Sequence, residues 1–94
     1  MDHRPPADLL ESVHTFPGTF QIRAIGSTAA DFVARILAAV EQAVAGPAEY
    51  EHSVRETAGG KHVSVTLHIQ VRDAEHVRDV YARLGEVEGL RLLL

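Results

Sequence analysis

The chain is poor in the residues that most often carry reactive or membrane functions. It has no cysteine, which excludes disulfide bonds, thiolate metal sites and cysteine nucleophiles. It has no tryptophan, and aromatic residues occupy only 5% of its 94 positions. No apolar run approaches the ~20 residues that span a bilayer, and residues 1–7 lack the apolar segment of a secretory signal. We therefore predict a cytoplasmic protein with no membrane partner.

The net charge and the chain length narrow the possible partners and the number of domains. The formal net charge of −4 argues against a polyanionic partner such as nucleic acid. A chain of 94 residues can build one core and is too short for two ordinary domains. Residues 1–7 contain two prolines and little that can pack, so we predict that they form a flexible leader. Residues 8–94 are predicted to be a single domain.

The clearest pattern in the chain is the strict alternation from Lys61 to Val71. Apolar residues alternate with polar ones, which is typical of a strand buried on one face only. The apolar positions are Val63, Val65, Leu67, Ile69 and Val71, and the polar positions are His62, Ser64, Thr66, His68 and Gln70. The function of such a sheet has to lie on its polar face, on its edges or in its loops.

Two further strands are predicted near the ends of the domain. Residues 19–25 alternate in the same way, with Phe20, Ile22 and Ala24 on the buried side. The last strand covers residues 90–94. We predict that its inward side chains are Leu90, Leu92 and Leu94, and that Arg91 points outward.

Helical periodicity occurs in three segments. They are residues 8–14, residues 29–44 and a segment that starts at residue 74. Ser27 or Thr28 can cap the second helix through a hydroxyl, and Asp73 can cap the third. Gly85 or Gly89 ends the third helix.

Residues 50–57 are predicted to pair with the alternating strand in a hairpin. They are mostly polar, which suits the edge of a sheet, and Gly59 and Gly60 supply a tight turn. If the loop is those two glycines, the register places Tyr50 opposite Ile69, Glu51 opposite His68, Val54 opposite Val65, and Arg55 opposite Ser64. This register turns His52 inward near Leu67, so a longer loop with a bulge stays open as an alternative.

The predicted order of elements defines the fold class. A short leader helix is followed by β-α-β-β-α-β. This order predicts an α+β protein with a ferredoxin-like sandwich, in which two helices cover one face of a four-stranded antiparallel sheet.

The histidines do not have the spacing of a metal site. His62 and His68 share a face but lie about 20 Å apart along a strand, too far to share an ion. Only one register of the hairpin brings together Glu51, His52 and His68. We therefore predict no metal site and no cofactor. The remaining histidines are predicted to lie in the leader or on the surface: His3, His14 and His76.

No catalytic group is predicted. Ser64 lies two residues from His62 and four from His68 on one strand, which separates the side chains by about 7 and 13 Å. A serine and a histidine at those distances do not form a nucleophile and base pair. The two glycines of the hairpin precede a strand rather than a helix, so they do not form a phosphate loop. We predict that the protein is not an enzyme.

Nucleic acid is an alternative partner for the polar sheet face. Single-stranded RNA binds such faces through stacked aromatic residues and surrounding basic residues. Four basic residues could contribute: Arg23, Arg55, Lys61 and Arg91. The polar face of the alternating strand has no aromatic residue for base stacking, so we rank this alternative second.

Several short segments together resemble a known family. They are Phe16–Phe20 leading into Ile22–Gly26, then Lys61–Thr66, Val80–Leu84 and Leu90–Leu94. In order and spacing they are similar to the YbeD-like family of small bacterial proteins of unknown function, over nearly the whole chain from Leu9. The chain departs from the family pattern at His62, where an aromatic residue is usual, and in its longer segment between Leu10 and Phe16.

The resemblance implies a ferredoxin-like fold related to the ACT regulatory domains, which bind amino acids at subunit interfaces. It implies no established activity. With the open polar face, it suggests a regulatory or adaptor domain that associates with itself or with another protein, with room for a small ligand such as an amino acid. The predicted partner surface comprises Arg23, Arg55, His62, Ser64, Thr66, His68 and Arg91.

Overall fold

The chain folds into helices and strands in the predicted order. The computed structural model describes residues 4–28, 31–57 and 59–94. Its elements are α1 (Ala7–Val13), β1 (Gly18–Ser27), α2 (Phe32–Ala43), the 3₁₀ turn η1 (Pro47–Glu49), β2 (Tyr50–Glu56), β3 (His62–Val71), α3 (Ala74–Gly85) and β4 (Leu90–Leu93).

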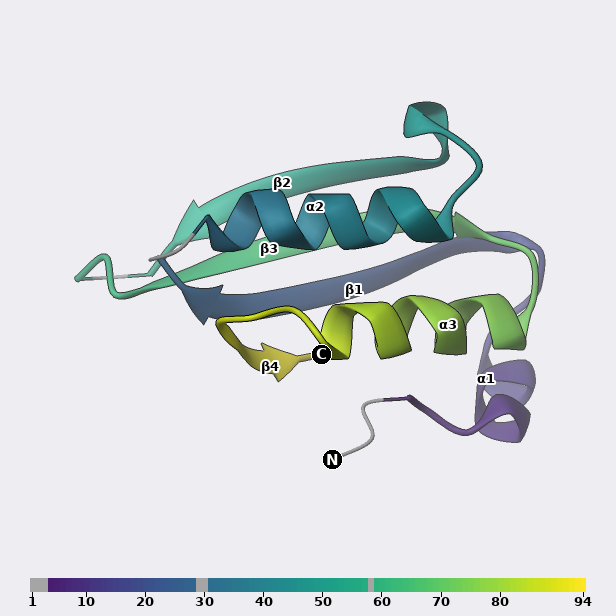
Figure 1. The fold of residues 1–94 in the computed structure, drawn as a ribbon. Helices are drawn as coiled ribbons and strands as arrows, with labels where there is room; N and C mark the ends of the chain where they lie inside the picture. Colours follow the sequence, from purple (N-terminus) through teal and green to yellow (C-terminus); the bar gives the residue numbers. More distant parts are fainter. Residues whose placement is uncertain (1–3, 29–30, 58) are drawn as a thin grey trace.

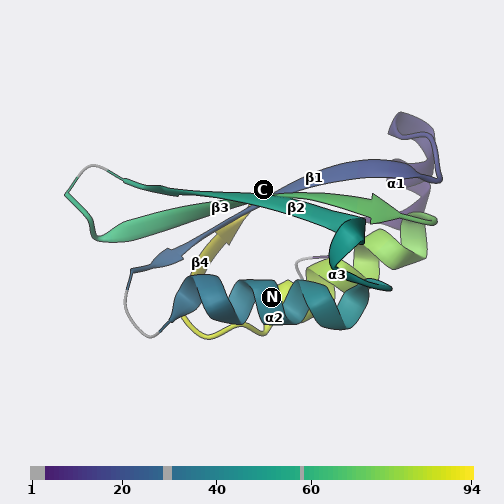
Figure 2. The same ribbon diagram turned by 90° about the horizontal axis from the view of Figure 1, so that it is seen from above.

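The four strands form one antiparallel sheet that is covered by helices on one face. The strand order is β2-β3-β1-β4, so β1 and β3 are central and β2 and β4 are edges. Helices α2 and α3 lie side by side on the same face, and α1 lies at one end of the sheet (Figures 1 and 2). This is the predicted ferredoxin-like sandwich.

The core lies between the sheet and the two long helices. The apolar residues of β3 are buried, and its polar residues are exposed or half-buried. Helices α2 and α3 bury one apolar stripe each, because their apolar residues recur every three or four positions. The largest side chains with at most 1% exposure are Ile22, Phe32, Ile36, Val40, Val65, Leu67, Ile69, Val77, Val80 and Leu84. The one-sided burial predicted from the alternation is confirmed.

The N-terminal segment packs against α3. Leu10 of α1 is buried, and Arg78 donates a hydrogen bond from Nε to the carbonyl oxygen of Pro5 at 3.1 Å. The proposed leader, residues 1–7, is described from Arg4 onward, and its first three residues lie outside the described residues.

The two long helices start differently. Asp73 caps α3 as predicted, because its Oδ1 accepts a hydrogen bond from the backbone N–H of His76 at 2.8 Å. The predicted cap of α2 by Ser27 or Thr28 is wrong. Asp31, in a left-handed conformation with φ of 55°, precedes the first turn and makes no side-chain capping bond. Thr28 instead donates its hydroxyl to the carbonyl oxygen of Gly60 at 2.9 Å. The predicted helical residues 29 and 30 lie outside the described residues.

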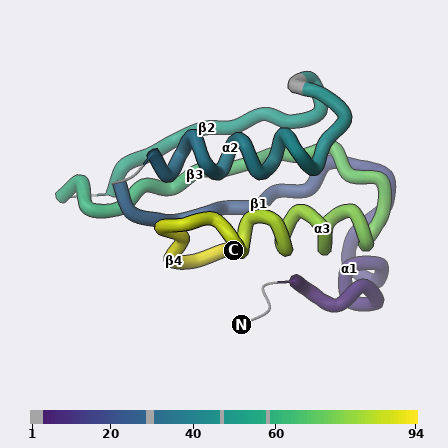
Figure 3. The backbone as a smooth tube through the Cα atoms, viewed as in Figure 1, coloured from purple at the N-terminus to yellow at the C-terminus, as the bar shows by residue number. Residues whose placement is uncertain are grey.

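The hairpin has the predicted register. Four predicted pairs are present: Tyr50 with Ile69, Glu51 with His68, Val54 with Val65, and Arg55 with Ser64. Beyond these pairs, the Thr57 N–H donates a hydrogen bond to the His62 carbonyl oxygen. In Figure 3 the hairpin that joins β2 to β3 projects beyond the helices.

Burial along β2 differs from the prediction. His52 is paired with Leu67 as expected, but its side chain is exposed, and Val54 is 47% exposed. The reason is that β2 is an edge strand, so the helices cover its neighbours more fully than β2 itself. A polar residue at position 52 therefore carries no burial cost.

A bulge corrects the predicted orientation of the last strand. β4 pairs Leu93 with Ala24 and Leu92 with Ile25, but Leu90 with Gly26, so Arg91 is an extra residue. The extra residue reverses the side-chain orientation beyond it. Leu90 and Leu93 pack against the core, whereas Leu92 is 46% exposed.

The predicted surface position of His76 is also wrong, because this side chain is buried. Its Nδ1 accepts a hydrogen bond from the Arg72 N–H at 3.1 Å, and its Nε2 lies 2.7 Å from the Ala43 carbonyl oxygen. Since Nδ1 is an acceptor, the ring proton is on Nε2 and is donated to Ala43. His76 thus joins the last turn of α2 to the start of α3.

Candidate functional site

The face of the sheet opposite α2 and α3 is the largest candidate surface, and we call it the open face. The strand pairing determines which side chains it carries, because alternate residues of each strand point to the same side. The open face comprises Thr19, Gln21, Arg23 and Ile25 of β1, Glu51, Ser53 and Arg55 of β2, His62, Ser64, Thr66, His68 and Gln70 of β3, and Leu92 of β4 with the adjoining Leu94.

Four of the predicted partner-surface residues are neighbours in two adjoining rows of the sheet. Arg55 lies opposite Ser64, which lies opposite Ile25. In the next row, Thr66 lies opposite Arg23. These four residues therefore lie together at the centre of the open face, and their role in binding a partner stays a prediction.

The other three predicted residues lie farther out. His68 is one row beyond Thr66 and lies opposite Glu51 and Gln21. His62 lies at the hairpin end of the face, opposite Ser27. Arg91 is the bulged residue of the edge strand β4 and has no direct partner in the ladder to β1.

The sequence prediction missed an apolar patch beside Arg23, formed by Ile25, Leu92 and Leu94. Leu92 lies opposite Ile25, and Leu94 exchanges two backbone hydrogen bonds with Arg23. Leu92 and Leu94 are 46% and 57% exposed. Both leucines are predicted to face the core. The run Leu92–Leu94 indicates only that Leu93 faces the other way from its two neighbours, and the bulge that turns Leu92 and Leu94 outward has no clear sign in the sequence.

The positively charged side chains of helices α2 and α3 form ion pairs, whereas those described on the open face do not. Helices α2 and α3 carry three arginines in ion pairs at 3.0–3.1 Å: Arg35 with Glu88, Arg78 with Glu75, and Arg83 with Asp79. Within the part of the chain that the structure describes, no side-chain hydrogen bond or ion pair is formed by Arg23, Arg55, Lys61 or Arg91. The open face and its rim therefore carry unneutralised positive charge on a protein that is negative overall.

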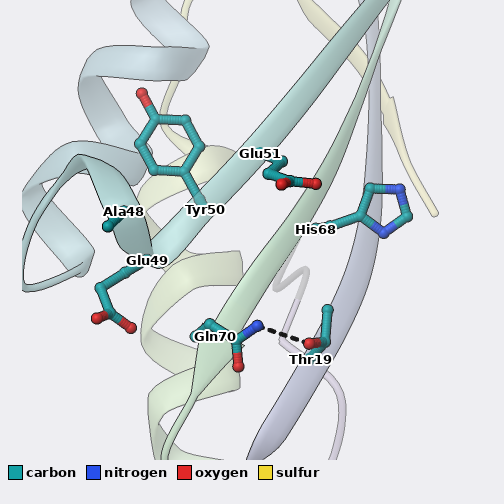
Figure 4. A pocket seen from close by; sticks show the side chains of 7 residues that line it. All are labelled: Thr19, Ala48, Glu49, Tyr50, Glu51, His68 and Gln70. Carbon is teal, nitrogen blue, oxygen red and sulfur yellow. Dashed lines mark hydrogen bonds between the residues drawn. The ribbon is translucent and has the colours of Figure 1, made fainter.

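A polar hollow of about 320 Å³ lies at the end of the open face near the start of β2. Its lining residues are Thr19, Ala48, Glu49, Tyr50, Glu51, His68 and Gln70 (Figure 4). Gln70 donates a hydrogen bond from Nε2 to the hydroxyl oxygen of Thr19 at 2.7 Å. The two carboxylates and the amide offer acceptors to a small polar ligand.

Tyr50 connects this hollow to α2. Its hydroxyl donates a hydrogen bond to Oε1 of Glu41 at 2.8 Å. This bond to a carboxylate raises the pKa of Tyr50 above its usual value. The contact ties the start of β2 to the helical layer.

The side chains of the described residues do not form a metal-binding or catalytic group. In residues 4–28, 31–57 and 59–94, no group of three or more His, Asp or Glu side chains is placed to hold a metal ion. Ser64 makes no hydrogen bond to His62 or His68 among these residues. No helix that the structure describes is long and apolar enough to cross a bilayer.

The sequence is similar to a family of known proteins. Residues 11–94 match the family described as a protein of unknown function (DUF493). A UPF0250 protein of Shewanella frigidimarina is 34% identical over 84 residues, which cover 89% of this chain and 93% of the relative. One of Shewanella oneidensis is 28% identical over 79 residues, which cover 84% and 88%. The chain therefore belongs to the DUF493, or UPF0250, family of small YbeD-like proteins, whose function is unknown.

Proposed function

We propose that the protein is a non-enzymatic regulatory or adaptor domain of the cytoplasm that binds a protein partner on its open face. The observation that carries this proposal is the apolar patch of Ile25, Leu92 and Leu94. Arg23 lies beside this patch and Arg55 lies in the same row of the sheet as Ile25, and neither forms an ion pair with another described residue. Protein interfaces combine a desolvated apolar centre with a polar rim in this way.

The chemistry of the patch defines the kind of partner. Covering the exposed leucines removes apolar area from water, which is the main favourable term in protein association. Arg23 and Arg55 can donate paired hydrogen bonds to carboxylates, and arginine is enriched at the energetic centres of interfaces. The partner is therefore expected to present apolar side chains flanked by aspartate or glutamate.

Single-stranded nucleic acid is the second candidate, and the unpaired cations favour it. The residues that we assign to the open face include no phenylalanine, tyrosine or tryptophan on which bases could stack, which favours the protein partner. Binding of nucleic acid predicts a steep loss of affinity with salt. A protein partner held by the apolar patch predicts a shallower loss of affinity with salt.

A small ligand could occupy the hollow between β1, β2 and β3. Its lining of carboxylates, amide and hydroxyl suits an amino acid or another molecule with an ammonium group. A thermal-shift screen of amino acids tests this part of the proposal. A Gln70→Leu variant, which removes the amide next to Thr19, is the matched control.

Site-specific photo-crosslinking in bacterial lysate tests the main proposal. A photoreactive residue at position 92 is expected to capture a discrete protein, whereas one at position 9 is not. Leu9 is a suitable control because it is 54% exposed and lies on α1, at one end of the sheet and outside its strands (Figure 1). Equal capture at both positions contradicts the proposal. Adducts at position 92 that disappear with nuclease support the second candidate instead.

A further inference from the structure

We propose that two copies of this chain pair along the outer edge of β2, so that their sheets join into one. Thr57 donates its backbone N–H to His62 of β3, so every second residue of β2 bonds in that direction. The backbone groups of His52 and Val54 therefore point away from the sheet. Among the residues that the structure describes, no hydrogen bond outside the regular strand ladder involves them. Such an edge is a template for another strand.

The charges of β2 are complementary to themselves about Ser53. Glu51 precedes Ser53 by two residues, and Arg55 follows it by two. The two side chains lie on the same face but about 13 Å apart, so they cannot pair within one chain. Neither forms an ion pair with another described residue. In an antiparallel pair with a twofold axis through Ser53, each Glu51 lies opposite Arg55 of the second copy.

The backbone geometry agrees with this register. His52 lies opposite Val54 of the second copy, and their outward N–H and C=O groups exchange hydrogen bonds. Glu51 and Arg55 then form the alternate type of pair, in which Cα atoms are only about 4.5 Å apart and side chains are closest. An axis through His52 or Val54 would place Glu51 opposite Ser53 or Thr57 and lose this reciprocal ion pair.

The pairing also covers apolar surface that the monomer exposes. Val54 is 47% exposed although it lies on the helix side of the sheet, and pairing places it against His52 of the second copy. The turn η1 lies beside the start of β2 (Figure 1), where it limits the pairing of a second strand. We therefore infer a short ladder between the two copies, over residues 51–55. An interface of this size predicts a weak, concentration-dependent dimer. The two open faces become one continuous surface.

Sedimentation velocity over a range of concentrations, up to the millimolar range, tests the register through charge reversal. Glu51→Arg or Arg55→Glu alone places like charges opposite each other twice, so each variant is expected to raise the dimer dissociation constant at least about tenfold. An equal mixture of the two variants restores both ion pairs in a heterodimer, as does the double variant in a homodimer. Glu11→Arg and Arg72→Glu are the matched controls, because both positions are exposed and lie outside β2.

The outcomes separate clearly. Loss of dimer in each single variant, with recovery in the mixture and in the double variant, supports the proposal. A wild-type protein that stays monomeric at millimolar concentration overturns it. Dissociation constants that do not change with charge reversal, or a mixture that does not recover, also overturn it. Circular dichroism of each variant verifies that the fold is retained.

Discussion

The two faces of the sheet differ in what their side chains contribute. On the helix-covered face, Val65, Leu67 and Ile69 are fully buried and stabilise the fold. On the open face, the intervening side chains of the same strand are exposed or half-buried. Neighbouring residues of β3 therefore have opposite roles, which allows stability and binding to be tested separately by substitutions one residue apart.

The largest expected difference is between Leu67 and Thr66. Leu67→Asp buries an unpaired carboxylate in the core and is expected to cost at least about 4 kcal/mol. A domain of this size has a net stability of about 5–14 kcal/mol, so this variant should lose a large part of its stability. Thr66→Asp is expected to change the free energy of unfolding by less than about 1 kcal/mol. Denaturant unfolding followed by circular dichroism measures both, and equal losses would contradict the one-sided sheet.

A smaller difference is expected between two histidines. His76→Ala leaves the Ala43 carbonyl and the Arg72 N–H without their buried partner, which should cost about 1–3 kcal/mol. His62→Ala removes an exposed side chain and should change the stability by less than about 0.5 kcal/mol. The same unfolding experiment compares them. If His76→Ala were as stable as His62→Ala, the proposed link between α2 and α3 would be wrong.

The bulge in β4 predicts unequal roles for two adjacent leucines. Leu93→Ala removes a side chain that packs against the core and should cost about 1–2 kcal/mol. Leu92→Ala removes an exposed one and should cost less than about 0.5 kcal/mol. The reverse order of unfolding midpoints would show that β4 has the regular alternation instead.

The smallest expected effect concerns pH. The bond to Glu41 raises the pKa of Tyr50, so the folded state holds this proton to a higher pH than the unfolded state does. Its contribution to stability is fully present below the ordinary tyrosine pKa of about 10 and is lost as pH rises through the raised value. Tyr50→Phe should therefore show a shallower decline in stability above pH 10 in urea titrations. Burial also raises the pKa of Tyr81, so a residual decline should remain. An unchanged slope in Tyr50→Phe would argue against the Tyr50–Glu41 bond.

Most of the fold was predictable because local patterns and long-range pairing agree. The alternation of β3, the glycines of the hairpin and the polar β2 all indicate one register, and that register is present. Two orientations were not predictable from local pattern. Arg91 is an extra residue only in relation to β1. His76 is polar by type, and its burial depends on hydrogen-bond partners in Ala43 and Arg72 that lie elsewhere in the fold.

The candidate site was predictable in its polar part and not in its apolar part. Arg23, Arg55, Ser64 and Thr66 follow from strand alternation alone. The contribution of Leu92 depends on the bulge, because an apolar residue on a strand is ordinarily assigned to the core. The residue types of β4 therefore do not reveal which side chains face outward, because that depends on the position of the bulge.

The most direct test of the separation between the faces is to measure folding and binding in one variant. Arg23→Glu combined with Leu92→Asp changes two open-face side chains and leaves the core untouched. We predict that its free energy of unfolding stays within about 1 kcal/mol of the wild type. Capture of the protein partner by photo-crosslinking from another open-face position, Ser64, should be lost. Retained capture, or a loss of stability as large as that of Leu67→Asp, would contradict the assignment of binding to the open face.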